Sequence, residues 1–322
     1  MKSLLSFVLI LALMPLFSGC GSNSQGTGAE TSRIRIQFDW LPEPEFGGFY
    51  AAKQLGLFEK RQLDVELRPG TAGSPVLQMV ASGQVEFGVS GGDDLLIARD
   101  HGLDVVPVFA AFQDCPLGLM LHAERPLTAV TDLFKAGTLA MIPGSTPLRF
   151  LERKYGFHGV RLVPTGNSLA TFLHDPLFTQ QCFITSEPVE AESQGSKVRV
   201  ILFKELGYNP YTGVVFTRRD YLKAHPQQVQ ALVEALRAGW QAYQSNPEAA
   251  IQEMRRLNPT MSLETFRRAT AIQEAFLWPE GLERSDGGTM VESRWQQLGQ
   301  TLLELNLIQS RPANVLESGP NP

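Results

Sequence analysis

The sequence has few of the side chains from which catalytic and metal sites are most often built. It contains five histidines and three cysteines among 322 residues, and their spacing matches no zinc-binding pattern. A Walker loop, a G-x-S-x-G motif and the glycine-rich dinucleotide-binding pattern are also missing from it. We therefore predict that the protein is not an enzyme and that it holds neither a metal ion nor a cofactor.

Neither sign of charge dominates, and long apolar runs are missing as well. Lys and Arg number 28 against 33 Asp and Glu, which gives a formal net charge of −5, whereas proteins that bind nucleic acid normally show a basic excess. No clean run of about 18 apolar residues predicts a membrane-spanning helix. Hydrophobic residues make up 43% of the chain and charged ones 19%, so we expect a globular protein with a sizeable core and no nucleic-acid partner.

The N-terminus predicts secretion followed by lipidation. Lys2 precedes an apolar run over residues 4–17, and two small residues then lead to Cys20. A basic start, a short apolar segment and small residues are typical of a signal peptide, here residues 1–19. The cysteine that follows resembles the lipidated cysteine of a bacterial lipobox. We expect a membrane-anchored lipoprotein of the periplasm or cell surface; a cleaved signal peptide with an incidental Cys20 is the alternative.

The sequence also predicts the state of two terminal segments and of two further cysteines. Residues 20–32 are mostly Gly, Ser and Thr, which predicts a flexible tether after the lipidated cysteine. Residues 309–322 are rich in Pro, Ser and Asn and predict a disordered tail. Cys115 and Cys182 lie beside apolar segments, so we expect free buried thiols. One long-range disulfide between them is the alternative in an oxidising compartment.

Strands and helices alternate along the body of the chain, which places it in the α/β class. Residues 33–39 alternate apolar and polar side chains, as a half-buried strand does. Further strands alternate with helices up to residue 111, and a second alternating set runs over residues 139–202. This order is typical of parallel sheets flanked by helices. From Asp220 onwards the pattern predicts a helical C-terminal third.

Polar and aromatic side chains occupy four loops that follow predicted strands. Parallel α/β sheets bind small ligands at the carboxyl ends of their strands, although turn and cap chemistry accounts for most residues of such loops. Trp40 offers a flat face for stacking, beside an acidic loop that Pro42 and Pro44 stiffen. The candidate ligand-binding residues of these loops are Asp39, Trp40, Glu45 and Phe46, then Ser90, Gly91 and Asp93, then Ser145 and Thr146, and finally Glu187.

Five stretches of the chain form a recognisable pattern, namely residues 38–42, 48–52, 56–59, 63–67 and 80–90. They resemble the substrate-binding proteins of bacterial ABC importers for thiamine pyrimidine precursors. That group is related to the fungal thiamine-pyrimidine synthases and to the alkanesulfonate, taurine and nitrate binding proteins. The resemblance runs over about residues 34–308 and includes Tyr211, which we add to the candidate ligand-binding residues.

The resemblance implies a two-lobed periplasmic-binding-protein clamshell of type II. Lobe one would comprise residues 33–117 and 213–308, and lobe two residues 118–212, with crossovers near 116–122 and 208–216. A monomer would capture its small-molecule ligand between the lobes and deliver it to the transmembrane subunit of an ABC permease. The lipid anchor would hold it at the membrane.

The family motif matches this chain at some positions and departs from it at one. Asp39 and Trp40 match the pocket motif, and Gly144 with Ser145 matches the Gly-Ser turn. The family loop often carries a histidine where this chain has Phe46, and the synthases use that histidine together with a cysteine cluster that is missing here. A synthase-type enzyme is therefore the less favoured alternative.

The charges of the loops predict the class of ligand. Carboxylates suit hydrogen-bond donors, whereas sulfonate or nitrate would favour Arg, Lys or bare helix N-termini. Only Arg149 opposes the acidic residues. We therefore expect a flat, nitrogen-bearing ligand similar to a thiamine pyrimidine precursor, with an anion such as an alkanesulfonate, nitrate or taurine as the alternative. The acidic residues at the predicted cleft are Asp39, Glu43, Glu45, Asp93 and Glu187.

Overall fold

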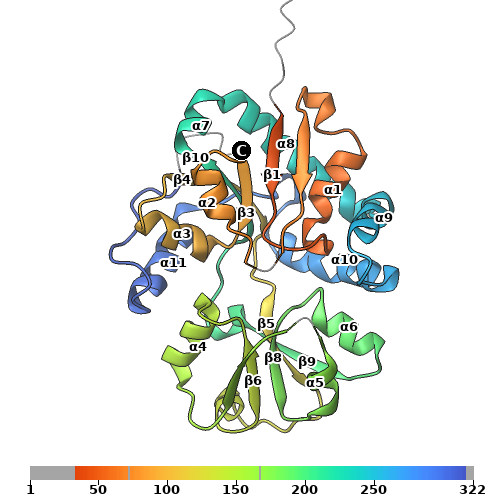
Figure 1. Cartoon of the computed structure of the whole chain (residues 1–322), viewed down its shortest axis with the longest axis vertical. Coiled ribbons are helices and arrows are strands. Elements are labelled where there is room, and N and C mark those ends of the chain that lie inside the picture. The colour runs from red at the N-terminus through yellow and green to blue at the C-terminus, as the bar shows by residue number, and fades with distance from the viewer. Residues whose placement is uncertain (1–32, 72, 167, 317–322) are drawn as a thin grey trace, which may run out of the picture. The chain divides into compact units, whose positions relative to one another are not determined.

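A computed structural model describes residues 33–71, 73–166 and 168–316 of the chain (Figure 1). Within these residues it forms two five-stranded sheets flanked by helices, as the α/β alternation predicts. The predicted signal peptide, Cys20 and the tether lie outside the described residues, as do residues 317–322.

The first sheet is mixed rather than wholly parallel. Its strand order is β2-β1-β3-β10-β4, in which β1 pairs in parallel with β2 and β3, while β10 runs antiparallel between β3 and β4. Strand β10 begins inside the segment that we expected to be a plain crossover, residues 208–216. The strands are β1 (Ile34–Gln37), β2 (Val65–Arg68), β3 (Phe87–Ser90), β4 (Val105–Phe112) and β10 (Thr212–Arg218).

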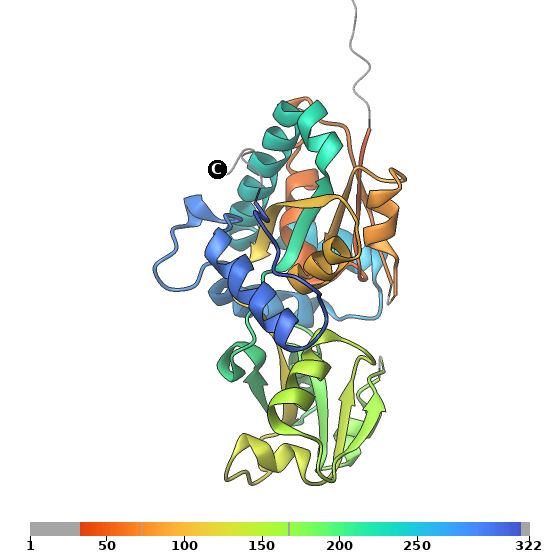
Figure 2. The same cartoon turned by 90° about the vertical axis from the view of Figure 1, so that its left-hand side faces the viewer.

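Helices cover both faces of the first sheet (Figures 1 and 2). Helices α1, α8, α9 and α10 share one apolar cluster with the sheet, and α2, α3 and α11 belong to the cluster on the other side. The helices are α1 (Gly47–Gln54), α2 (Val76–Ala81), α3 (Gly92–Asp100), α7 (Arg219–Ala224), α8 (Pro226–Ser245), α9 (Glu248–Leu257), α10 (Leu263–Leu277) and α11 (Glu292–Glu304). Short 3-10 turns occur at η1 (Pro44–Phe46), η2 (Glu59–Arg61) and η5 (Arg284–Asp286).

The second sheet lies wholly between β4 and β10 in the sequence. Its order is β7-β6-β8-β5-β9, with β6 parallel to β7 and β8, and β5 antiparallel to β8 and β9. The strands are β5 (Leu117–His122), β6 (Thr138–Met141), β7 (Arg161–Pro164), β8 (Phe178–Phe183) and β9 (Val198–Leu202). Its helices are α4 (Thr146–Tyr155), α5 (Ala170–His174) and α6 (Glu187–Ser193), with 3-10 turns η3 (Val130–Phe134) and η4 (Phe203–Leu206).

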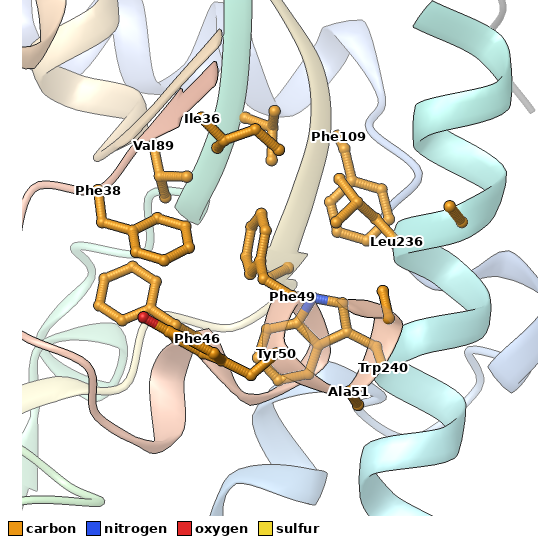
Figure 3. Packing of buried hydrophobic residues seen from close by; sticks show 14 of the residues in the cluster. Ile36, Phe38, Phe46, Phe49, Tyr50, Ala51, Val89, Phe109, Leu236 and Trp240 are labelled. Atoms are coloured by element: carbon orange, nitrogen blue, oxygen red, sulfur yellow. The ribbon is translucent and has the colours of Figure 1, made fainter. Parts of the chain in front are cut away.

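The first sheet with its helices is called the first unit, and the second sheet with its helices the second unit. The aromatic core of the first unit explains how α1 and α8 approach so closely (Figure 3). The Trp240 ring of α8 lies edge-on to Phe49 of α1 and to Phe112 of β4, with ring centroids 6.2 Å and 5.9 Å apart. Gly48 permits this contact, because a Cβ atom there would lie 2.3 Å from the Trp240 ring. Helix α1, which follows the loop after β1, is thus packed tightly against α8.

The C-terminal segment is ordered further than the sequence predicts. Residues 309–316 pack against α3 and α11, although we expected a disordered tail from residue 309. Asp100 accepts hydrogen bonds from the amides of Gln309 and Ser310, and Glu292 accepts those of Val315 and Leu316. Val315 is completely buried, so composition alone misjudged this segment.

Candidate functional site

Carboxylates from three strand ends form the most unusual group of side chains in the described structure. Asp39 and Glu45 follow β1, Asp94 lies in the first turn of α3 after β3, and Glu187 begins α6 after β8. Each has a raised pKa. Burial is the largest cause for Asp39, Glu45 and Glu187, and the protein packed around the exposed Asp94 is the largest cause there. We call these four residues, together with Glu43, the carboxylate cluster.

The charges of the cluster act on one another, which places its members close together. Burial raises the pKa of Glu45 well above its usual range, and the charges of Glu43, Asp39 and Glu187 raise it further. The pKa of Asp39 rises to about 7 through burial. That of Glu187 also rises to about 7, through burial and then the charges of Glu43 and Glu190. At neutral pH the cluster therefore contains protonated carboxyl groups.

Glu45 is the member of the carboxylate cluster with a buried oxygen, Oε2, that lacks a hydrogen-bond partner among the described residues. An unpaired buried polar atom is costly unless a ligand or water satisfies it. Glu45 lies two residues before Gly47, where the ring of Tyr243 is so close that a Cβ atom would lie 2.1 Å from it. Tyr243 in turn bonds Thr270 at 2.8 Å, which holds the hydroxyl end of that ring in place.

Glu43 connects the first loop to the second sheet. The indole N–H of Trp40 donates to its Oε1 atom at 3.3 Å, and the hydroxyl of Ser186 donates to its Oε2 atom at 3.1 Å. The Trp40 ring is half-buried against the first core cluster, so one part of it stays accessible. Trp40 thus lies beside the carboxylate cluster with its indole nitrogen already engaged.

The two neighbouring aspartates of the second loop lie in different surroundings. Asp93 accepts a 2.5 Å hydrogen bond from the Tyr208 hydroxyl and is 9% exposed, so it has a partner within the protein. Its neighbour Asp94 is exposed, yet the protein packed around it, and then the charges of Asp93 and Asp39, raise its pKa to about 8. Ser90 lies within 3.5 Å of the Asp94 carboxylate, and Gly91 is the N-cap of α3.

The third loop is not tied to the carboxylate cluster by any hydrogen bond or ion pair of the described residues. Ser145 precedes α4 and its buried hydroxyl has no partner there, and Thr146 is 4% exposed. Arg149 lines a separate hollow of about 350 Å³ with Glu152, Arg153 and Leu305. The basic residue that we set against the carboxylates therefore lies in other surroundings.

Phe46 and Tyr211 pack inside the protein instead of lining an open surface. Phe46 is 2% exposed and stacks on Phe38 with 4.3 Å between ring centroids. Tyr211 is 3% exposed, its hydroxyl accepts the Val291 amide at 3.0 Å, and the Arg294 guanidinium lies 3.9 Å from its ring centroid. Phe46 and Tyr211 are thus buried, whereas Trp40 is half-buried.

The remaining expectations from composition can be compared with the described residues. Cys115 and Cys182 are free buried thiols, as we expected, and burial raises the pKa of Cys115 to about 12. Residues 33–71, 73–166 and 168–316 contain no group of three or more His, Cys, Asp or Glu side chains placed to hold a metal ion. Over the same residues, every helix is too short or too polar to cross a bilayer.

The fold is shared with solved substrate-binding proteins. The periplasmic aliphatic sulphonate binding protein SsuA of Escherichia coli superposes with a TM-score of 0.64 at 17% identity, covering 87% of this chain and 89% of that one. The structure therefore has the periplasmic-binding-protein fold, which confirms the fold predicted from the sequence.

Sequence relatives include binding proteins and enzymes. The riboflavin-binding protein RibY of Chloroflexus aurantiacus is 24% identical over 68% of this chain, and the formylaminopyrimidine-binding protein of Halalkalibacterium halodurans is 29% identical over 41%. The matches span only 64% and 40% of those two relatives. A 4-amino-5-hydroxymethyl-2-methylpyrimidine phosphate synthase of Saccharomyces cerevisiae is 21% identical over 77% of this chain and 79% of its own length.

The family assignment rests on a longer match. The NMT1/THI5-like family matches residues 43–250, more than half of the 322 residues. This stretch begins in the loop that carries Glu43 and Glu45 and includes the whole second sheet. The chain belongs to the NMT1/THI5-like family.

Proposed function

We propose that this protein is the extracytoplasmic solute-binding component of an ABC importer. It would capture a flat, nitrogen-bearing small molecule at the carboxylate cluster and deliver it to the permease. One observation carries the proposal: Trp40 lies beside a cluster of carboxyl groups that comes from three strand ends. Relatives named for binding riboflavin and formylaminopyrimidine, both flat nitrogen heterocycles, support it.

The chemistry of the cluster favours hydrogen-bond donors over anions. Carboxylates accept N–H groups, and an aromatic ring gains further stabilisation by stacking on an indole. No cation contributes to the pKa of Asp39, Glu45 or Glu187, so a sulfonate or nitrate would find no positive charge to pair with there. An amine or aminopyrimidine would instead supply the missing partner of the buried Glu45 oxygen.

A synthase-type enzyme is the second candidate, because several relatives carry that name. The resemblance assigns a histidine to the position of Phe46, and here that side chain is a phenyl ring stacked on Phe38. A phenyl ring cannot transfer a proton or ligate a metal. Binding without bond chemistry therefore remains the favoured function.

The proposed location follows from the N-terminal sequence. The signal-peptide pattern of residues 1–19 and the lipobox-like Cys20 support export and anchoring by lipid, with the rest of the chain working as a monomer outside the cytoplasm. Replacement of Cys20 by Ser should release the expressed protein from the membrane fraction. Persistent pelleting of that variant with membranes would contradict lipid anchoring.

The experiment that tests the proposal is a thermal-shift screen of the full chain. The panel would contain an aminopyrimidine, riboflavin, thiamine, ethanesulfonate and nitrate. A ligand at 100 times its dissociation constant adds about 2.7 kcal/mol to the free energy of unfolding, which raises Tm by several degrees. We expect a shift with one of the nitrogen heterocycles. A shift with an anion alone would overturn the proposed ligand class.

The matched variants of the screen are Glu45→Gln and Arg149→Ala. Glu45→Gln removes a carboxyl group of the cluster and should abolish or strongly reduce the shift. Arg149 is exposed and lines the separate hollow, so its replacement should leave the shift intact. The opposite pattern would move the binding site to α4.

A further inference from the structure

Glu43 is bonded on both of its carboxylate oxygens by groups from different units of the fold. Trp40, three residues before it, donates to one oxygen at 3.3 Å. Ser186, 143 residues away, donates to the other at 3.1 Å. Ser186 is the N-cap of α6, which follows a strand of the second sheet, whereas Trp40 follows a strand of the first. One carboxylate thus bonds an aromatic side chain of the first unit and a helix of the second.

Helix α6 is tied to the first unit at its other end as well. Glu192, in the last turn of α6, forms an ion pair with Arg268 of α10, whose helix packs in the core of the first unit. Both partners are more than one-third exposed, so this pair adds little stability on its own. The two links thus join α6 to the first unit at two places, the loop after β1 and helix α10.

The chemistry of Glu43 is unsuited to a purely structural cross-link. Its side chain is largely buried, at 9% exposure, and both of its bonds come from neutral donors, Trp40 and Ser186. Burial raises its pKa, and the charge of Glu190 adds to that effect. A buried carboxylate without a cation costs stability, whereas a glutamine or an apolar contact would join the two segments at lower cost. Its presence therefore points to a role in the site.

We propose that Glu43 is a positioning residue that couples the orientation of the Trp40 ring to the docking of helix α6. The inference rests on the proposed function only for the identity of the ligand that stacks on Trp40. When α6 docks, Ser186 fixes the Glu43 carboxylate, and the carboxylate then holds the indole at a fixed angle. When α6 moves away, Glu43 loses one of its two donors and the indole is released. Closure and preparation of the stacking surface are then one event.

The test uses the full chain without ligand and follows the fluorescence of Trp40. The sequence contains four tryptophans, so each spectrum is corrected by subtracting that of the same variant with Trp40→Phe. Ser186→Ala removes the hydroxyl that donates to Glu43 and leaves the Trp40 side chain itself unchanged. We expect it to shift the Trp40 emission to longer wavelength and to raise the acrylamide quenching constant about twofold, because the indole becomes more accessible to water.

Three further variants distinguish coupling from a general loss of structure. Ser193→Ala is the matched control, because this serine lies on the same helix and donates only to the carbonyl of Glu190; its spectrum should equal that of the unchanged chain. Ser186→Thr keeps a hydroxyl and should restore the unchanged spectrum. Glu192→Gln loosens the far end of α6 and should produce a smaller shift in the same direction. A Trp40 spectrum that Ser186→Ala does not alter would overturn the coupling.

The outcome is separable from that of the proposed function. The fluorescence test needs no ligand, so a silent thermal-shift panel leaves it fully informative. If riboflavin or the aminopyrimidine binds, Ser186→Ala should weaken that binding about two- to tenfold, the range expected for one hydrogen bond. Unchanged binding by Ser186→Ala would overturn the coupling while leaving the receptor function in place.

Discussion

Trp40 is the residue on which stacking of the proposed ligand depends. Its ring is half-buried, and its nitrogen is engaged by Glu43, so the ring face is the part left for a ligand. Trp40→Ala should weaken ligand binding by about 1–3 kcal/mol, as truncation of other aromatic anchors does. Isothermal titration calorimetry measures this loss.

The control for this prediction is another tryptophan outside the cluster. Trp278 follows α10 and lies beneath the guanidinium of Arg284, 5.5 Å from the ring centroid. Trp278→Ala should therefore leave the dissociation constant unchanged. Equal dissociation constants for the unchanged chain and the Trp40 variant would mean that the Trp40 ring serves only the core.

The raised pKa values of the cluster make stability depend on pH. The folded-state pKa of Asp39 and of Glu187 is about 7, well above the ordinary value near 4 that both have in the unfolded chain. The folded protein therefore binds more protons than the unfolded chain between about pH 4 and 7. Its free energy of unfolding falls as the pH rises through that window.

This pH dependence can be measured by thermal unfolding between pH 5 and 8. Tm should decrease with rising pH, and Glu187→Gln should flatten the decrease, because glutamine has no proton to release. On the order of 3 kcal/mol of stability is at stake for each such group. A cationic ligand would bind more tightly as the pH rises and the carboxylates ionise. A Glu187→Gln profile parallel to that of the unchanged chain would show that Glu187 does not titrate in this range.

At the scale of single elements, a cluster of hydrogen bonds joins the two segments that connect the sheets. Asp114, between β4 and β5, accepts hydrogen bonds from Lys204 at 2.8 Å and from Asn209 at 2.9 Å. Asn209 also accepts the Cys115 amide at 2.8 Å. Burial opposes the charge of Asp114, but Lys204 and Asn209 outweigh it and keep its pKa below the usual range. The two connections are thereby held side by side.

Asp114→Asn should destabilise the protein by about 1–3 kcal/mol, since it leaves a partly buried lysine without its anion. Urea unfolding monitored by circular dichroism gives the difference. The matched control is Arg33→Ala, because Arg33 and Asp64 form an exposed pair, with 61% and 44% of their side chains accessible, and such pairs contribute little. A similar loss in both variants would contradict a special role for the connections.

The C-terminal segment is the second element whose contribution can be isolated. A chain that ends after Ile308 would lose the buried Val315 and the backbone bonds to Glu292. It should lose about 1–3 kcal/mol, the value of one buried apolar side chain with its attendant bonds. A chain that ends after Leu316 keeps every one of these contacts and should unfold like the full chain. Equal stability of both truncations would show that the segment adds nothing.

At the scale of the whole molecule, the α/β class and the family could be predicted from the sequence, and both are confirmed. Alternation of polar and apolar side chains marks a strand wherever it is half-buried, but it carries no information about the partner strands. Strand β5 illustrates the limit: it is buried at its centre and contains Gly118, so it lacks the alternation that identified β1. The antiparallel pairing of β10 could not be predicted from the sequence pattern either.

The candidate site was predictable to the level of loops but not of single side chains. The rule that ligands bind at the carboxyl ends of strands selected the loops that carry Asp39, Glu45 and Glu187, and the structure brings these three together. The same rule could not choose between Asp93 and Asp94. Adjacent residues in a first helical turn point about 100° apart, so only the tertiary structure decides which of them meets Tyr208.

The position of β10 also governs the order in which the chain can fold. Strands β3 and β4 are not neighbours; β10, which comes about a hundred residues after β4, must be inserted between them. The second sheet, in contrast, is complete by Leu202 and needs no segment from outside it. Pulsed hydrogen exchange during refolding should therefore find protected amides in β5–β9 before β3 and β4. The first unit, which carries Trp40, would remain open at its middle until about two-thirds of the polypeptide has been made.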